Sequence, residues 1–505
     1  MFNKKKSNDR EIQYAQRALE QALDYESWLG HAQRLDQLTG GLEWRGEVRS
    51  PYYPYELLQK QITTIREFKE NHQFESLIAF LQESLHLTLG ELSDAHLYNV
   101  ALTGTKYLIE EYLAEIESVL DYLCDKELEG VSLEQKVLLF KHARKNFGVT
   151  ALMLSGGGAF GIYHLGIVKC LLGEGLLPRV ISGTSMGAIV TGLVGTHTDE
   201  ELEKILQEPE KHHFRPIKLN SLSGIRQQRA LMQGEQLLEC VTTNIPEISF
   251  LEAYKKTGRA INITVSPTRF GQRARILNYK TAPDVLVSYA CKASCSIPGV
   301  FPATQLHAKF DGVECPEPYM PNELWADGGV NTDIPMGRIG RMHNANHFIV
   351  SQTNPHVLPF VVNREKQGAI PFVMDFISSS VHAQWHQFIT VSKKRVEGRY
   401  MRFWLDRADA LLGQDYLGDI NLHPSFPLQR YLKVMANPSN DEIKDFILTG
   451  ERATWPKLAM IRNQTRISRA LYNCHQRVQQ KLMLSNAQNE SIHSGSNAQE
   501  VFIKG

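Results

Sequence analysis

A serine stands between two glycines in the sequence Gly183-Thr184-Ser185-Met186-Gly187, at the spacing G-x-S-x-G. A short apolar run precedes this motif and a helix-forming run follows it, which is the setting of a nucleophile elbow. In such a turn the serine backbone is strained, and a side chain in place of Gly183 or Gly187 would clash. Because the motif alone also occurs by chance, its position between a strand and a helix is what predicts Ser185 as a nucleophile.

A glycine-rich segment, Ser155-Gly156-Gly157-Gly158-Ala159-Phe160-Gly161, joins an earlier expected strand to an expected helix. Glycines expose main-chain N–H groups, and the helix adds the positive end of its dipole, so the segment is suited to bind an anion. That anion could be the oxyanion of an acyl-transfer reaction or a dinucleotide pyrophosphate, since the glycines match G-x-G-x-x-G. A plain strand-to-helix turn is the third interpretation.

The dinucleotide interpretation requires an acidic residue about 20 residues on, at the end of the next strand. The next expected strand, 179–182, instead runs into the serine motif. We therefore expect an oxyanion hole formed by the main chain at Gly156, Gly157, Gly158 and Gly161.

The base that would accept the serine proton is either a histidine or a carboxylate. Histidines downstream of the serine include the candidates His343, His347, His356, His382 and His386, and none of these lies in a recognisable catalytic turn. His164 precedes the serine and falls inside an expected helix, so we interpret it as structural.

The candidate carboxylate is Asp327, which ends an expected strand and is followed at once by Gly328 and Gly329. A partly desolvated carboxylate at a sheet edge, bonded to the serine, would serve as base. A plain Asp-Gly turn is the alternative. Asp333 is a weaker rival, which we expect to shape the following turn. The residues thus favour a dyad of Ser185 and Asp327.

Alternating apolar runs and helical stretches from residue 150 onward predict an α/β core with a mainly parallel sheet between helices. Strands are expected at 150–154, 179–182, 260–265, 324–326 and 348–351, with helices at 160–172, from 188, and at 284–293. The first part of the chain has helical periodicity, and so has much of the last part. We expect four ranges: a helical domain at 1–148, the catalytic domain at 149–353, a helical extension at 354–484 and a disordered tail at 485–505.

The composition argues against several functions. Lys plus Arg and Asp plus Glu number 55 each, so no net charge attracts nucleic acid. The seven scattered cysteines do not suggest disulfides or a metal site, and we expect neither a metal nor another cofactor. The basic start is followed by polar residues, and no run is long enough to span a membrane. We expect a cytoplasmic protein whose contact with a membrane or lipid surface is peripheral.

The glycine-rich segment, the serine motif and the Asp327-Gly328-Gly329 turn stand in an order that resembles the patatin-like phospholipase family. The segment at 293–302 is also similar to one that precedes the aspartate in that family. The resemblance implies a patatin-like core at 149–353, a Ser185–Asp327 dyad without histidine, an oxyanion hole from the glycine loop, no metal in the chemistry and acyl-lipid substrates.

The segment at 344–356 and the loop with Trp44-Arg45-Gly46 are similar to the triacylglycerol lipases of fungal lipid droplets and plant oil bodies. Two positions depart from the pattern: Phe160 stands where plant patatins carry Arg, and Met186 where the oil-body lipases often carry Ala or Val. The departures preserve the chemistry and leave the substrate and the lipid-droplet location open.

Together these features predict a serine carboxylic-ester hydrolase that releases fatty acids from acyl lipids, with triacylglycerol as the first candidate substrate. A phospholipase A, a lysophospholipase or an acyl transferase would use the same dyad. A catalytically silent lipid-binding scaffold is the alternative from another class, although it would be expected to have lost Ser185 or Asp327. The oligomeric state has no signature in the sequence.

A basic amphipathic stretch at 457–481 has six Lys or Arg and no acidic residue. Its apolar positions recur mostly at spacings of three and four, which predicts a helix with an apolar stripe. One hypothesis is that this helix lies in a membrane interface. The alternative is that the stripe packs on the protein core and the charges are solvated.

Overall fold

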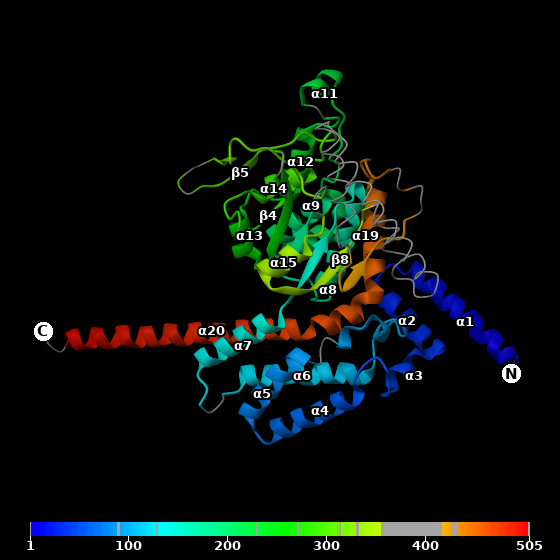
Figure 1. Ribbon diagram of the computed structural model, residues 1–505, viewed down its shortest axis with the longest axis vertical. Coiled ribbons are helices and arrows are strands. Elements are labelled where there is room, and N and C mark those ends of the chain that lie inside the picture. Colours follow the sequence, from blue (N-terminus) through cyan, green and yellow to red (C-terminus); the bar gives the residue numbers. More distant parts are fainter. Residues whose placement is uncertain are drawn as a thin grey trace, which may run out of the picture. The chain divides into compact units, whose positions relative to one another are not determined.

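The computed structural model describes residues 2–87, 91–127, 130–228, 230–269, 272–310, 312, 315–329, 333–354, 417–426, 430 and 433–502 (Figure 1). Its contacts divide the chain into two compact units. The α/β unit comprises Thr150–Trp455, and the helical unit combines Met1–Val149 with Pro456–Gly505. This division differs from the predicted ranges, because the described part of 354–484 contributes to both units.

The helical unit is built from long helices around one apolar cluster. Its helices are α1 (Phe2–Gln21), α2 (Tyr25–Thr39), α3 (Gly41–Gly46), α4 (Tyr55–Glu70), α5 (Phe74–Leu87), α6 (Tyr107–Asp125), α7 (Leu133–Phe147) and α20 (Leu458–Phe502), with short 3-10 turns at Glu91–Ser93 and Ala95–Leu97. In α6, the apolar residues Leu108, Tyr112, Ile116 and Leu120, spaced four residues apart, are buried, whereas Tyr107 is exposed.

Helix α20 contains the basic amphipathic stretch and runs through most of the range expected to be disordered. Its apolar stripe lies in the core of the helical unit, where it packs with α6 and α7 through Ile467, Ala470, Leu471, Cys474 and Val478. Its cations pair with carboxylates of α6: Arg466 with Glu117 at 2.6 Å and Lys481 with Asp125 at 3.1 Å. The hypothesis that this stripe enters a membrane interface is therefore wrong, because the stripe is already buried.

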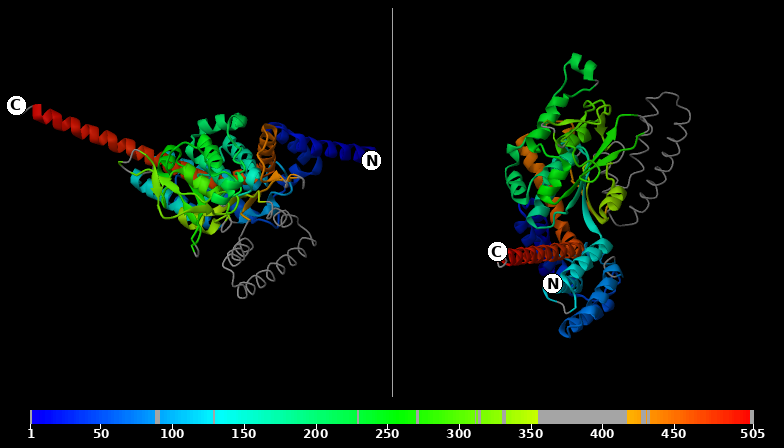
Figure 2. Two further views of the ribbon diagram at one scale, coloured as in Figure 1. Left: turned by 90° about the horizontal axis from the view of Figure 1, so that it is seen from above. Right: turned by 90° about the vertical axis from the view of Figure 1, so that its left-hand side faces the viewer.

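The α/β unit contains a sheet flanked by helices (Figure 2). The strands are β1 (Val149–Leu154), β2 (Val180–Gly183), β3 (Ala260–Pro267), β4 (Arg275–Leu277), β5 (Leu306–Ala308), β6 (Glu317–Tyr319), β7 (Trp325–Asp327), β8 (Ala345–Ser351) and β9 (Ile420–Leu422). The helices are α8 (Tyr163–Gly173), α9 (Met186–Thr196), α10 (Asp199–Gln207), α11 (Leu222–Gln228), α12 (Gly234–Asn244), α13 (Phe250–Thr257), α14 (Val287–Cys295), α15 (Met336–His343) and α19 (Asn440–Thr454). Short 3-10 turns lie at Gly158–Ile162, Pro209–Lys211 and Trp455–Lys457.

The described residues form a seven-stranded sheet in the order β4-β3-β2-β1-β8-β9, with β7 also paired to β3. The pairs β1–β2, β2–β3 and β8–β9 are parallel, whereas β4 and β7 run antiparallel to β3. The mainly parallel sheet predicted from the sequence is confirmed. Strand β9 extends it, so part of the range expected to be a helical extension belongs to the core.

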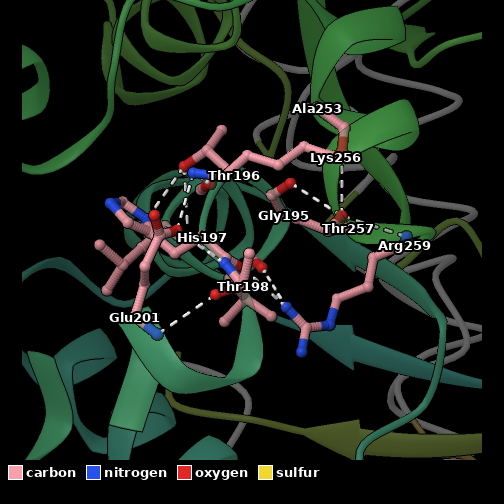
Figure 3. A network of polar contacts seen from close by, with 12 residues as sticks. Gly195, Thr196, His197, Thr198, Glu201, Ala253, Lys256, Thr257 and Arg259 are labelled. Carbon is pink, nitrogen blue, oxygen red and sulfur yellow. Dashed lines mark hydrogen bonds and ion pairs between the residues drawn. The ribbon is translucent and has the colours of Figure 1, made fainter. Parts of the chain in front are cut away.

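Arg259, the residue before β3, binds the C-terminal end of α9 (Figure 3). Its guanidinium donates hydrogen bonds to the carbonyls of Val194 at 2.8 Å and His197 at 2.9 Å, and pairs with Asp199. A cation at this end complements the negative end of the helix dipole. Since α9 begins directly after Ser185, this contact holds the helix that carries the candidate nucleophile.

Candidate active site

Ser185 occupies the turn between β2 and α9 with φ 53° and ψ −124°, and is 9% exposed. A non-glycine residue rarely adopts this backbone, which costs roughly 1–3 kcal/mol and persists only where the surroundings impose it. A Cβ built on Gly183 would overlap the carbonyl oxygen of Gly187, and one on Gly187 would overlap that of Leu154. The close packing of this turn therefore requires both motif glycines.

Two consecutive hydrogen bonds through Ser294 on α14 hold the strained turn in place. The main-chain N–H of Ser185 donates to Oγ of Ser294 at 2.9 Å, and this hydroxyl donates to the carbonyl of Thr264 on β3 at 2.8 Å. The sequence analysis assigned no function to Ser294. Only its position in the 293–302 segment pointed to it, because a small polar side chain is needed where α14 meets the elbow.

The glycine-rich segment lies against the serine. A Cβ built on Gly156 would be 3.3 Å from Cβ of Ser185. The N–H of Gly156 donates to Oδ1 of Asp333 at 2.9 Å, and that of Ala159 to the carbonyl of Val434 at 3.0 Å. Within the described part of the chain, the N–H groups of Gly157 and Gly158 meet no acceptor. These two amides are therefore the ones free to bind an oxyanion beside Ser185.

Gly161 lies in the 3-10 turn Gly158–Ile162 that leads into α8. A Cβ at this position would overlap the side chain of Met186, the residue after the serine. Gly161 thus lets the glycine-rich segment approach the elbow closely, while Gly156 is engaged with Asp333. An oxyanion hole from this segment stays a prediction, and the geometry concentrates it on Gly157 and Gly158.

Asp327 is buried at the end of β7, opposite Val265 of β3. Its carboxylate accepts the N–H of Gly329 at 2.7 Å, so the glycine turn orients it. A Cβ on Gly328 would come within 2.5 Å of the main chain of Thr264. Val265 pairs with β4 on one edge of β3 and with Asp327 on the other, so β7 lies on the edge that β2 occupies. Gly183 pairs with Ile263, two residues before Val265, so the carboxylate follows the end of β2 along the same edge.

The thiol of Cys295 connects the two predicted dyad residues. Burial, and next the charge of Asp327, raise the pKa of Cys295 well above its usual value. A side-chain hydrogen bond with Ser185 acts on this pKa in the opposite direction. Cys295 also lines the same cleft as Ser185, so this buried thiol lies near the predicted nucleophile and within the electrostatic reach of Asp327.

His164 is fully buried on α8, with its ring bonded to Oγ of Ser351 at 2.6 Å and to the carbonyl of Ser155 at 2.9 Å. Burial lowers its pKa to about 4. A neutral imidazole that links the glycine-rich segment to β8 agrees with the structural role expected for it.

Of the other histidines, His343 bonds Asn262 at 2.8 Å and His347 bonds Thr150 at 3.1 Å. Both contacts lie along the sheet and not at the elbow. His356, His382 and His386 lie outside the described residues.

A cleft with about 490 Å³ of space, part of it open to solvent, leads to Ser185. Apart from Ser185, its walls are almost entirely apolar or glycine main chain. They include Gly158, Met186, Ile189, Phe214, Ile217, Leu237, Cys295, Ile297, Phe301 and Val434. Such a lining fits a hydrocarbon chain, and the described residues of the wall offer no set of polar groups for a nucleotide or a sugar.

No cluster of three or more His, Cys, Asp or Glu suited to a metal occurs among the described residues. Within the same residues, no helix is both long enough and apolar enough to cross a membrane.

The predicted catalytic residues of this site lie within a segment that matches a known protein family. A family model described as "Patatin-like phospholipase" matches residues 152–337, which include the glycine-rich segment, Ser185 and Asp327. Triacylglycerol lipase ptl3 of Schizosaccharomyces pombe is 30% identical over 471 residues, 89% of this chain and 94% of its own length. The chain belongs to the patatin-like phospholipase family. Its patatin-like core is preceded by a match at residues 5–145 to a domain of unknown function, DUF3336.

Other relatives of this patatin-like protein are longer than it is. Triacylglycerol lipase 4 of Saccharomyces cerevisiae is 33% identical over 88% of this chain, but the match spans only 50% of that protein. Triacylglycerol lipase SDP1L of Arabidopsis thaliana is 32% identical over 90% of this chain and 57% of its own length. Among solved structures, VipD from Legionella pneumophila aligns with 59% of this chain and 67% of its own at 13% identity, with a TM-score of 0.28.

Proposed function

We propose that this protein is a serine carboxylic-ester hydrolase that releases fatty acids from acyl lipids. The observation that carries the proposal is the strained Ser185 at the wall of an apolar cleft, next to the unengaged amides of Gly157 and Gly158. Strain of this kind is retained where it presents a reactive group. The cleft would hold the acyl chain while the serine hydroxyl faces the ester carbonyl.

In the proposed reaction, Oγ of Ser185 attacks the carbonyl carbon and Asp327 accepts the serine proton. The carbonyl oxygen becomes an oxyanion, which the N–H groups of Gly157 and Gly158 stabilise. The tetrahedral intermediate then releases the alcohol, which takes the proton from Asp327, and leaves an acyl-enzyme. Water gives a proton to Asp327 as it attacks this ester, and Asp327 returns that proton to Ser185 as the fatty acid departs. Transfer of the acyl group to another alcohol would follow the same steps.

Triacylglycerol is the substrate we propose first, because three relatives that match most of this chain are named triacylglycerol lipases. The apolar cleft supports a long acyl chain but does not distinguish a glyceride from a phospholipid. Incubation with a mixture of triacylglycerol, phosphatidylcholine and lysophosphatidylcholine, followed by analysis of the released products, separates lipase from phospholipase activity. A new acylated alcohol among the products would indicate transacylation.

The nucleophile is tested with a fluorophosphonate probe and a short soluble ester. Ser185→Ala should abolish both labelling and hydrolysis. Ser288→Ala is the matched control, since Ser288 is also buried in the α/β unit and its hydroxyl has no partner among the described residues. Labelling that persists in Ser185→Ala would overturn the assignment and point to another serine, whereas a parent that is neither labelled nor active would favour the lipid-binding scaffold.

The base is tested by comparing Asp327→Asn with Asp333→Asn. Loss of a catalytic base typically lowers turnover by about a thousandfold or more. We expect this effect for Asp327→Asn and a far smaller one for Asp333→Asn, whose amide oxygen would still accept the N–H of Gly156. The opposite ranking would move the role of base to Asp333.

A further inference from the structure

A narrow projection extends from the α/β unit beside the cleft. It contributes no residue to the proposed reaction. Its stem pairs two segments of chain: the N–H of Gln233 donates to the carbonyl of Lys218 at 2.8 Å, and that of Asn220 to Leu231 at 2.9 Å. Helix α11 forms its tip and stands away from the rest of the unit in two perpendicular views (Figures 1 and 2). We call residues 218–228 and 230–233 the projection.

The projection exposes three leucines. Leu222 is 89% exposed, Leu219 69% and Leu231 49%, and α11 buries none of its residues. Single exposed apolar residues are ordinary on protein surfaces. Three large ones on one protruding element are different, because the described part of the chain places no body of protein on which they could pack. An apolar tip of this kind indicates contact with another surface.

The charge around these leucines has one sign. From Lys211 to Gly234 the sequence contains no Asp or Glu. On the projection, Lys218 and Arg226 are exposed, and neither makes an ion pair with any residue that the structure describes. A partner that binds both the leucines and these cations needs an apolar interior and negatively charged groups at its surface.

The projection is continuous with the wall of the cleft. Phe214, Pro216 and Ile217, which line the cleft, lead directly into the first segment of its stem. On the return, the N–H of Leu231 donates to the carbonyl of Gly299 at 3.2 Å. Gly299 lies between the cleft residues Ile297 and Phe301. Both ends of the projection's stem are therefore joined to the wall of the cleft.

We infer that the projection docks the enzyme on an anionic phospholipid surface, with the leucines among the acyl chains and Lys218 and Arg226 at the head groups. This inference rests on the proposed function, because it supplies the route by which an insoluble ester reaches Ser185. Apolar insertion and electrostatic attraction act together in interfacial binding. The attraction between exposed charges weakens in salt, so binding should too.

The experiment measures sedimentation of the full-length protein with phosphatidylcholine liposomes, with and without phosphatidylserine. All proteins carry Ser185→Ala, so that binding is measured without hydrolysis. Replacement of Leu219, Leu222 and Leu231 by Ser should weaken binding to the anionic liposomes by about tenfold or more. Lys218→Gln with Arg226→Gln should lower binding by a similar factor on the anionic liposomes and have little effect on phosphatidylcholine alone.

The matched control replaces three equally apolar, exposed leucines of the helical unit, Leu23, Leu57 and Leu138, by Ser. We expect this variant to bind as the parent does. Unchanged binding by the projection variant, equal losses in both variants, or no binding by the parent would each overturn the docking role. If the tip binds a protein partner and not lipid, the parent will not bind the liposomes.

A second readout separates this inference from the proposed function. With Ser185 restored, the projection variant should hydrolyse a short soluble ester at the normal rate and lose activity only on triacylglycerol emulsions or liposomes. If the soluble activity also falls, the leucines support the fold or the cleft, and docking is overturned. If the parent binds liposomes but hydrolyses no ester, the proposed function fails while the docking surface stands.

Discussion

The main-chain N–H of Gly156 donates a hydrogen bond to Oδ1 of Asp333 at 2.9 Å. The other oxygen of this carboxylate accepts a bond from Nδ2 of Asn354, and the carbonyl of Asp333 accepts the hydroxyl of Thr184 at 2.7 Å. One buried residue therefore joins the glycine-rich segment, the residue before the nucleophile and the chain after β8. Asp333 thereby sets where the free amides of the segment lie relative to Ser185.

The first prediction concerns these hydrogen bonds of Asp333, which we call the Asp333 clamp. Asp333→Ala would leave the buried N–H of Gly156 without its acceptor, which costs about 1–3 kcal/mol and lets the glycine-rich segment move. We expect turnover on a soluble ester to fall by about tenfold to a hundredfold, because the oxyanion donors lose their position. Asp333→Asn keeps an acceptor and should retain most of the activity. Equal activity in both variants would show that the clamp does not position the segment.

The second prediction is a dependence of stability on pH. Burial raises the pKa of Asp333 to about 7 from an ordinary value of 3.8. The folded state therefore holds a proton that the unfolded state releases, so this group's contribution is full below pH 3.8 and is lost as the pH rises to about 7. A tenfold difference in proton affinity between the two states corresponds to about 1.4 kcal/mol of stability.

Asp333→Asn removes that titration. Relative to the parent, its free energy of unfolding should improve by roughly 3 kcal/mol between pH 5 and pH 8. His164 has the opposite sign: its pKa is lowered to about 4, so its contribution is present above pH 6.5 and lost on acidification. Since His164 titrates alike in both proteins, it cancels in the difference measured by urea unfolding. A difference that does not change with pH would mean that Asp333 is ionised throughout.

The third prediction tests the strain at the nucleophile. At φ 53° and ψ −124°, Ser185 costs the fold roughly 1–3 kcal/mol, and glycine would avoid that cost. The greater freedom of glycine in the unfolded chain subtracts only about 0.4–1 kcal/mol. Both Ser185→Gly and Ser185→Ala should be inactive, but the glycine variant should unfold at the higher temperature. If alanine proves as stable as glycine, the elbow is not strained in solution.

Much of the core was predictable because its signals are local. Short apolar runs between helical stretches predicted the strands β1, β2, β3, β7 and β8 to within a few residues. The elbow was predictable for the same reason, since Gly183, Ser185 and Gly187 act through contacts within one turn and its neighbouring strand. Such patterns need no knowledge of how distant segments meet.

What the sequence could not provide depends on contacts between distant segments. The antiparallel direction of β7 and the bond from Asp333 to Gly156 join residues that are far apart in the chain. The apolar stripe of α20 fitted a lipid interface and a protein core equally well by its periodicity. Only the presence of α6 and its carboxylates, more than 300 residues away, decides between them.

The last prediction concerns the support of the glycine-rich segment by α8 and α19. These helices cross so closely that a Cβ on Gly166 of α8 would overlap the carbonyl of Ile447, and one on Gly450 of α19 would overlap that of Tyr163. Main-chain atoms cannot move aside as a flexible side chain can. Gly166→Ala should therefore separate the helices and destabilise the α/β unit by about 1–3 kcal/mol.

Gly173 provides the matched control in the same helix, because a Cβ there would meet nothing within 4 Å. Gly173→Ala should be neutral or stabilising by up to about 1 kcal/mol, since alanine favours the helix and restricts the unfolded chain. Since α8 follows directly on the 3-10 turn Gly158–Ile162, its displacement in Gly166→Ala should also lower turnover, whereas Gly173→Ala should leave turnover unchanged. Thermal unfolding and soluble-ester kinetics of the two variants measure both effects. If the two alanines behave alike, the close crossing does not hold the catalytic segment in place.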